Sequence, residues 1–160
     1  MSDLTTDQKG AIAETAITHA AVSLGLGVYR PVVEGGRYDL IFDVRGRLLR
    51  VQCKYAPLMN GVVVVRIYST RRTASGLVRR PYTAGEIDAV AAYCPEIDAC
   101  YILPAERFAV NQQVHLRVDP ARNNQSTGVH RADDFLMERL QSAILPPHRT
   151  LGRRWRTHRG

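Results

Sequence analysis

The chain has 160 residues, of which 45% are hydrophobic and 23% are charged, as is typical of one globular domain with a substantial core. Its longest apolar run, GVVVVRIY at residues 61–68, is much shorter than the roughly 18 residues that a membrane-spanning helix needs, so we expect no membrane partner. The net charge of +7 favours a polyanionic partner, with a merely soluble basic protein as the alternative.

The cysteine and histidine residues predict neither a disulfide framework nor a zinc site. Cys53, Cys94 and Cys100 form no CxxC pair, and the five histidines lack the spacing of metal ligands. The polar first residues, MSDLTTDQKG, differ from a secretory signal. We therefore expect a reducing, cytoplasmic environment.

The first expected element is a helix over residues 6–25. Thr6 or Asp7 can cap its start, and Gly25 can end it. Its apolar side chains recur at helical spacing and belong to Ala13, Ile17, Ala20, Ala21 and Leu24. Glu14 stands at the margin of this stripe, so we expect its carboxylate at the packing boundary of the helix.

Eight further segments follow in an order that predicts an α/β fold. We expect strands at residues 27–36, 37–44, 47–56, 61–68, 100–104 and 115–119, and helices at residues 83–93 and 131–144. This order predicts a mixed β-sheet flanked by helices. Residues 1–145 would form a single domain, and residues 146–160 a basic tail that we expect to be disordered when free.

The segment RVQCKYA, residues 50–56, predicts a strand with one apolar face and one polar face. If Arg45 and Gly46 form the centre of a tight turn, opposed residues on the two strands have numbers that sum to 91. Asp39 then faces Gln52, and Lys54 lies two residues further along the same face. The turn therefore predicts a cluster of a carboxylate, an amide and an ammonium.

This cluster contains the ligand atoms that Mg²⁺ prefers, which are hard oxygens. Asp39 offers a carboxylate, Gln52 an amide oxygen and Cys53 its backbone carbonyl, and Glu14 on the preceding helix could complete the shell. Lys54 beside the cation could orient water or balance charge on a phosphate. The alternative is an exposed strand face with an Asp–Lys pair worth under about 1 kcal/mol.

Lysine usage favours the functional interpretation. Of the 22 basic residues only Lys9 and Lys54 are lysines, so arginine is used almost everywhere. A compact ammonium with a tunable pKa is not replaceable by a planar guanidinium, which singles out Lys54.

Segments that are rich in arginine and free of acids are candidates for phosphate contact. The first is TRRTASGLVRRP at residues 70–81, which we expect to be a loop. Its arginines are Arg71, Arg72, Arg79 and Arg80. The second is the tail, which includes Arg153 and Arg154. Asn124 and Gln125 can read adenine in DNA, with an ordinary loop as the alternative.

Five segments in order resemble the PD-(D/E)xK nuclease superfamily, especially its branch of group I intron-encoded homing endonucleases. They are QKGAIAE, VYRPVVEGGRYDL, VQCKYA, YTAGEIDAVAAY and NNQSTGVHRADDF, and they span roughly residues 7–136. The resemblance implies a restriction-endonuclease-like core and a Mg²⁺-dependent endonuclease, with Mn²⁺ as a possible substitute. It also implies double-stranded DNA as substrate and a homodimer or homotetramer, since a double-strand cut needs two sites.

The resemblance also implies roles for individual residues. Glu14 and Asp39 would be metal ligands, Gln52 would take the place of the second acid, and Lys54 would be the catalytic lysine. The chain departs from the superfamily pattern at Gln52, which is neutral, and at Tyr38, which stands where a proline is common. A neutral ligand lowers the charge of the site and should weaken metal binding.

Other functions stay open at this point. A non-catalytic DNA-binding protein on the same fold is favoured by Gln52, and it would bind DNA without metal and never cut it. Homing, restriction-like cutting, mismatch repair and junction resolution would all use the same cluster, and so would an RNA nuclease.

Overall fold

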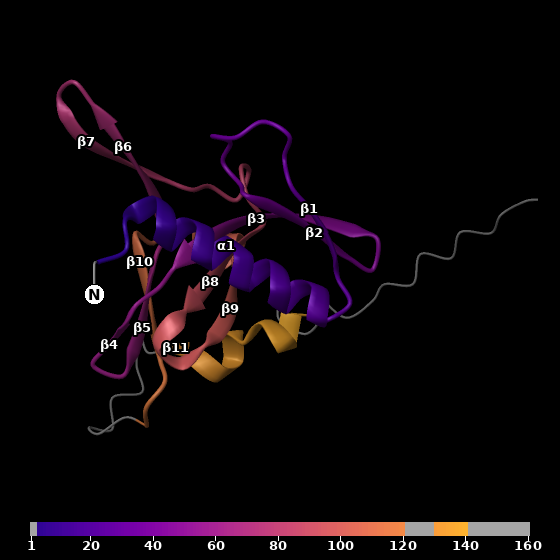
Figure 1. Cartoon of the computed structure of the whole chain (residues 1–160). Helices are drawn as coiled ribbons and strands as arrows, with labels where there is room; N and C mark the ends of the chain where they lie inside the picture. Colours follow the sequence, from indigo (N-terminus) through magenta and orange to yellow (C-terminus); the bar gives the residue numbers. More distant parts are fainter. Residues whose placement is uncertain (1–2, 121–129, 141–160) are drawn as a thin grey trace, which may run out of the picture.

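The computed structural model describes residues 3–120 and 130–140. A five-stranded mixed sheet lies at its centre, in the order β1–β2–β3–β8–β9, with β3 parallel to β8 and the other neighbours antiparallel. Its strands are β1 (Gly27–Tyr29), β2 (Leu40–Val44), β3 (Arg47–Tyr55), β8 (Ala89–Cys94) and β9 (Ala99–Pro104). The expected mixed α/β architecture is confirmed (Figure 1).

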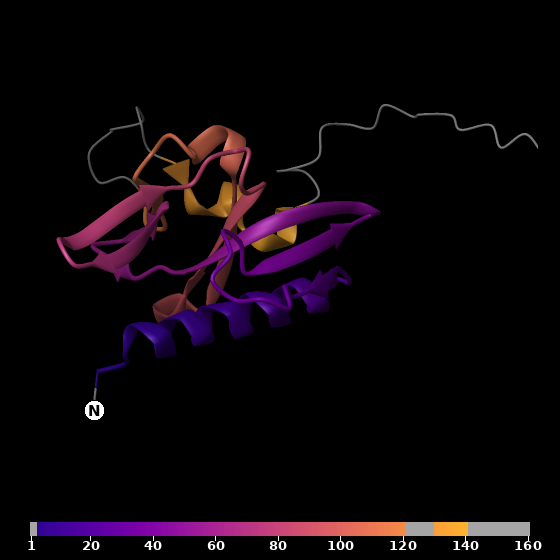
Figure 2. The same cartoon turned by 90° about the horizontal axis from the view of Figure 1, so that it is seen from above.

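Helix α1 (Thr6–Ser23) packs along one face of this sheet (Figure 2). Its start is a capping box, in which the Thr5 side chain accepts the backbone N–H of Gln8 and the Gln8 side chain accepts the backbone N–H of Thr5. Ala13, Ile17 and Ala21 are fully buried against the sheet. The expected first helix is therefore confirmed, although its cap precedes the two residues that we expected.

A second, smaller sheet covers the opposite face of the central sheet. Its order is β11–β10–β5–β4, and its residues pack with Val90 and Leu103 of the central sheet. The strands are β4 (Leu58–Met59), β5 (Val62–Arg66), β10 (Gln113–Arg117) and β11 (His130–Arg131). The short helix α2 (Ala105–Phe108) follows β9 and buries Phe108 in the same core.

A separate hairpin of β6 (Tyr68–Thr73) and β7 (Gly76–Pro81) projects from the body of the molecule (Figure 1). We expected a loop at residues 70–81, and this expectation was wrong. The two strands pair from Tyr68 with Pro81 to Thr73 with Gly76. All the β7 residues are exposed, so no apolar alternation marks the hairpin in the sequence.

The expectation of a helix at residues 83–93 was also wrong, because residues 89–94 form β8, a strand of the central sheet. Ala89 and Ala91 pack on the α1 side of the sheet, while Val90 and Ala92 pack on the other side. A short apolar run that is buried on both faces has no period of two, so its sequence cannot be told from a buried helix.

The prediction of a closing helix at residues 131–144 is wrong for residues 131–140, which the structure describes. His130 and Arg131 form the short strand β11, and two 3₁₀ turns follow at Ala132–Phe135 and Met137–Arg139. Residues 141–144 and the predicted tail at 146–160 lie outside the described residues. Within residues 3–120 and 130–140, no helix has the length and apolar character needed to cross a membrane.

Candidate active site

The predicted register of the β2–β3 hairpin is confirmed. Leu40 faces Val51 and Ile41 faces Arg50, so opposed residue numbers sum to 91. Arg45 and Gly46 both have positive φ, of 55° and 83°, as a tight hairpin turn requires. The ladder continues through a 2.9 Å hydrogen bond from Asp39 N to Val51 O, which brings Asp39 opposite Gln52.

Asp39 is held in a fixed position by β3. Its Oδ2 accepts a 2.8 Å hydrogen bond from the Cys53 backbone N–H and a further one from the Gln52 side-chain amide. Gln52 is only 8% exposed, so the polar face of β3 is not ordinary solvated surface. Burial raises the pKa of Asp39, while these hydrogen bonds and the charge of Lys54 act in the opposite direction.

Glu14 lies on α1, and its carboxylate faces the same cavity as that of Asp39. The two carboxylates line a cavity of about 710 Å³, which α1 and the loop between β1 and β2 enclose. Burial raises the pKa of Glu14, and the negative charge of Asp39 raises it further. Arg30, from the same loop, forms an ion pair with Glu14 and lowers this pKa in part.

Lys54 lies two residues beyond Gln52 and completes the predicted cluster. Its Nζ donates to the backbone oxygen of Tyr68 at 2.9 Å and to the hydroxyl of Tyr82 at 3.1 Å. Burial lowers the pKa of Lys54 to about 8, against the opposing effect of the Asp39 charge. Near neutral pH the side chain can therefore act as a cation or release its proton at low cost.

These residues fit a hard divalent cation. Two carboxylates with raised pKa values, Glu14 and Asp39, would regain a favourable charged state beside it. Here Gln52 turns its amide nitrogen toward Asp39, and its oxygen is the atom that a cation would need. In the described part of the chain, no three His, Cys, Asp or Glu side chains gather, so any site depends on Gln52 or a backbone carbonyl such as that of Cys53.

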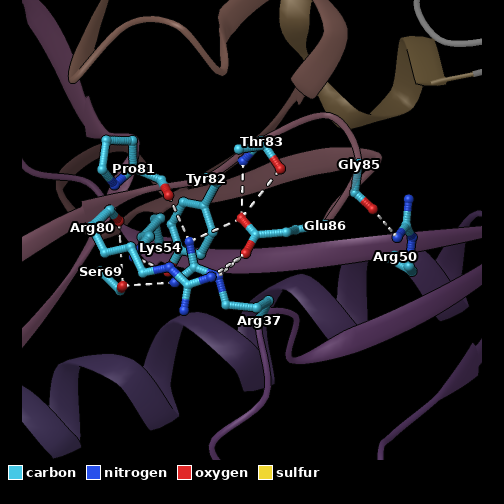
Figure 3. A network of polar contacts seen from close by, with 10 residues as sticks. All are labelled: Arg37, Arg50, Lys54, Ser69, Arg80, Pro81, Tyr82, Thr83, Gly85 and Glu86. Atoms are coloured by element: carbon cyan, nitrogen blue, oxygen red, sulfur yellow. Dashed lines mark hydrogen bonds and ion pairs between the residues drawn. The ribbon is translucent and has the colours of Figure 1, made fainter.

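Sequence reasoning missed the polar network around Lys54. Arg37 forms a bidentate ion pair with Glu86, and its guanidinium lies 4.3 Å from the ring centroid of Tyr82 (Figure 3). Tyr82 is 3% exposed, and burial raises its pKa to about 12. The only sequence signal is position, since Arg37 precedes Asp39 by two residues and Tyr82 follows the arginine-rich segment directly.

The β6–β7 hairpin carries the first set of candidate phosphate contacts on both of its faces. Directly opposed residues share a face, so Arg72 and Arg79 lie on one side and Arg71 and Arg80 on the other. Arg79 covers the ring of Tyr68, at 5.0 Å from its centroid, whereas Arg80 forms an ion pair with Glu86. The other candidates, Asn124, Gln125, Arg153 and Arg154, lie outside the described residues.

Comparisons with known proteins identify the family and the fold of the chain. A family model described as "PD-(D/E)XK endonuclease" matches residues 4–138. A solved structure of a bacterial homing endonuclease, I-Ssp6803I, is 31% identical in sequence and superposes with a TM-score of 0.67, covering 83% of this chain and 89% of that one. No curated protein matches the chain.

The matched residues 4–138 include α1, the β2–β3 hairpin and the cluster of Glu14, Asp39, Gln52 and Lys54. The similar structure covers most of both chains, so the likeness is not confined to one motif. The architecture is that of a restriction-endonuclease-like fold. The chain belongs to the PD-(D/E)XK endonuclease family.

Proposed function

We propose that the chain is a divalent-metal-dependent DNA endonuclease, homing or restriction-like, that hydrolyses phosphodiester bonds. One observation carries the proposal, which is the approach of the hydrogen-bonded pair of half-buried Asp39 and buried Gln52 to Lys54 on one side and to Glu14 on the other. Removing charged groups from water costs stability, and such groups with shifted pKa values gather at functional sites.

Glu14, Asp39, the Gln52 amide and the Cys53 carbonyl would hold Mg²⁺ or Mn²⁺ as oxygen ligands. The bound cation would supply positive charge to the scissile phosphate. Lys54 would donate a hydrogen bond to a phosphate oxygen or to the attacking water, because two contacts already fix its ammonium. Its lowered pKa lets it pass a proton at little cost.

The arginines of the β6–β7 hairpin would contact the DNA backbone. A two-stranded ribbon fits the major groove of B-DNA, and arginines on both faces would reach the phosphates on both sides of that groove. One chain contributes one such cluster, so a cut through both strands would need two copies, as in a homodimer or homotetramer.

A non-catalytic DNA-binding protein is the second candidate, and Gln52 is the observation that favours it. The amide nitrogen of Gln52 donates a hydrogen bond to Asp39, which stabilises this carboxylate without a cation. Such a protein would bind DNA equally well in EDTA and would not cut it.

Cleavage of supercoiled plasmid and phage DNA separates these functions. We expect the wild type to cut in Mg²⁺ or Mn²⁺ and not in EDTA, and Asp39→Asn to lose both cutting and Mn²⁺ binding by titration. Asp43→Asn is the matched control, since Asp43 lies further along the same segment, on β2, and its carboxylate accepts the backbone N–H of Gly46 in the hairpin turn. If Asp39→Asn bound Mn²⁺ with the affinity of the wild type, the metal site would have to lie elsewhere. Cutting in EDTA would rule out the metal-dependent mechanism.

A further inference from the structure

The ammonium of Lys54 is bound to the root of the β6–β7 hairpin. Tyr68, whose backbone oxygen accepts one hydrogen bond, is the first residue of β6. Tyr82, whose hydroxyl accepts the other, follows the last residue of β7. Tyr68 and Pro81 form the last pair of the hairpin, so Lys54 lies where its two strands enter the body of the protein.

Arg37 forms hydrogen bonds to both strands of the hairpin at this root. One guanidinium nitrogen, Nη1, donates to Ser69 Oγ on β6 at 2.9 Å, and the other, Nη2, donates to the backbone oxygen of Pro81 on β7 at 2.6 Å. The remaining contacts of Arg37 go to Glu86, at 3.1 and 3.2 Å. Each donor group of the guanidinium thus has an acceptor, and together these contacts fix the hairpin root (Figure 3).

The ring of Tyr82 joins these two sets of contacts. The Arg37 guanidinium lies 4.3 Å from its centroid and the Lys54 ammonium 4.9 Å from it. Because the ring is buried, it cannot turn away without disturbing both cations. Arg37 is also two residues from Asp39 in the chain. A shift of the root would therefore displace Lys54 through its hydrogen bonds and Asp39 through the backbone.

We propose that Tyr82 and Arg37 are positioning residues that fix Lys54 to the root of the β6–β7 hairpin, so that seating the hairpin on DNA and placing the lysine at the scissile phosphate are coupled. The proposal rests on the proposed function, since it takes DNA as the hairpin's partner. The rest of the hairpin is largely exposed, and the hairpin contacts the body of the protein mainly at this root. A movement of the hairpin when its arginines bind DNA would therefore displace the residues of the root.

The usual alternative is that the network only stabilises the fold. In that case Tyr82→Phe and Arg37→Lys would lower the free energy of unfolding and would leave the response of Lys54 to DNA unchanged. The chain is suited to this distinction because Lys9 and Lys54 are its only lysines. Lysine labelled with ¹³C at Cε therefore gives two methylene signals, which Lys9→Arg assigns.

The experiment records the Lys54 signal before and after saturation with a 30-base-pair duplex, in EDTA to prevent cutting. We expect the duplex to shift the signal in the wild type, and the shift to fall at least twofold in Tyr82→Phe and Arg37→Lys at equal saturation. Tyr93→Phe, which loses a hydroxyl contact to Asp98, and Arg50→Lys, which keeps its charge beside Asp88, are matched controls that should retain the full shift.

A kinetic readout accompanies the spectra. The single-turnover cleavage rate of Tyr82→Phe at saturating plasmid should fall about tenfold, while its Kd for the duplex stays within twofold, because the hairpin arginines are untouched. Equal shifts in the wild type and both variants would overturn the coupling, and so would a Lys54 signal that does not move with DNA bound. A protein that cuts plasmid but shows neither effect loses only this inference, whereas a protein that neither binds duplex nor cuts loses the proposed function as well.

Discussion

If Lys54 is the catalytic lysine, as we propose, Gln52 takes the place of an acidic residue of the PD-(D/E)xK motif, and its surroundings explain why a neutral side chain is stable there. It is 8% exposed and donates to Asp39, whose charge also acts on Glu14. A carboxylate in the same place would add a third negative charge with no donor between it and Asp39. The amide therefore stabilises the cluster without a cation, and a cation bound there would have one charged ligand fewer.

Replacing Gln52 by glutamate should reverse that balance. Without metal, Gln52→Glu should lose about 2 kcal/mol in the free energy of unfolding, because an unpaired buried carboxylate meets Asp39. Mn²⁺ should then bind more tightly than to the wild type and restore much of that loss. Denaturant unfolding in EDTA and in Mn²⁺ measures both effects, with the exposed Gln113→Glu as control. Equal stability of Gln52→Glu and wild type in EDTA would contradict this account.

Lys54 should leave a signature in the pH dependence of stability. Its pKa is about 8 in the folded chain and 10.5 in the unfolded one, so between these values the unfolded chain binds more protons. Stability should therefore rise with pH across that window, by an amount on the order of 2–3 kcal/mol from this group. Well below pH 8 Lys54 is protonated in both states, and the cost of burying its charge is present in full.

The comparison of wild type with Lys54→Met isolates this contribution, because methionine fills similar space and does not titrate. The difference in unfolding free energy, wild type minus variant, should increase between pH 7.5 and pH 10 in urea titrations. A difference that stays constant over this range would mean that Lys54 keeps its ordinary pKa in the folded chain.

At the level of secondary structure, the β6–β7 hairpin is the element that presents the arginines proposed to contact DNA. Its arginines lie on both faces, and it contains no acidic residue to offset them. The sequence showed the charge but not the hairpin, because exposed strands lack the alternation that reveals half-buried ones. The consequence is that the arginines have a fixed spacing on a ribbon and are not spread along a loop.

Combined replacement of Arg71, Arg72 and Arg79 by glutamine tests the hairpin as a phosphate-binding element. Each lost phosphate contact should reduce the slope of log K against log salt by roughly 0.9, so the triple variant should lose up to about 3 in slope. Arg80 is left in place because it forms an ion pair with Glu86. Titration of a fluorescent duplex at several salt concentrations measures the slope.

Arg47→Gln is the control for that series, because Arg47 is the exposed first residue of β3, beside the turn of the β2–β3 hairpin. Its slope should change by less than one contact. If the triple variant kept the wild-type slope, the hairpin would not be the DNA-binding element.

Across the chain as a whole, the sequence predicted best where local turn geometry decides the outcome. Arg45 and Gly46 determine the β2–β3 register, and that register alone brings Asp39 opposite Gln52. Local patterns failed at β8, where burial on both faces removes periodicity. They failed again after His130, where the described residues form a short strand and two 3₁₀ turns in place of the expected helix.

The long-range part of the site was beyond sequence reasoning for a related reason. Arg37, Tyr82 and Glu86 meet only because β8 lies beside β3 and carries the preceding turn to the hairpin root. Nothing in their own segments indicates this meeting. The cluster across one hairpin could therefore be predicted, whereas the network that holds Lys54 needed the tertiary structure.

The most direct test of the account is the cleavage of plasmid and phage DNA in Mg²⁺ by Lys54→Ala, beside the wild type and Lys9→Ala. Removal of the ammonium should slow cutting by at least about 100-fold, since it removes charge stabilisation at the reacting phosphate. DNA binding in EDTA should stay within twofold, and Lys9→Ala should cut like the wild type. Cutting by Lys54→Ala at the wild-type rate would contradict the account, because the cluster on β3 would then not be the site of the reaction.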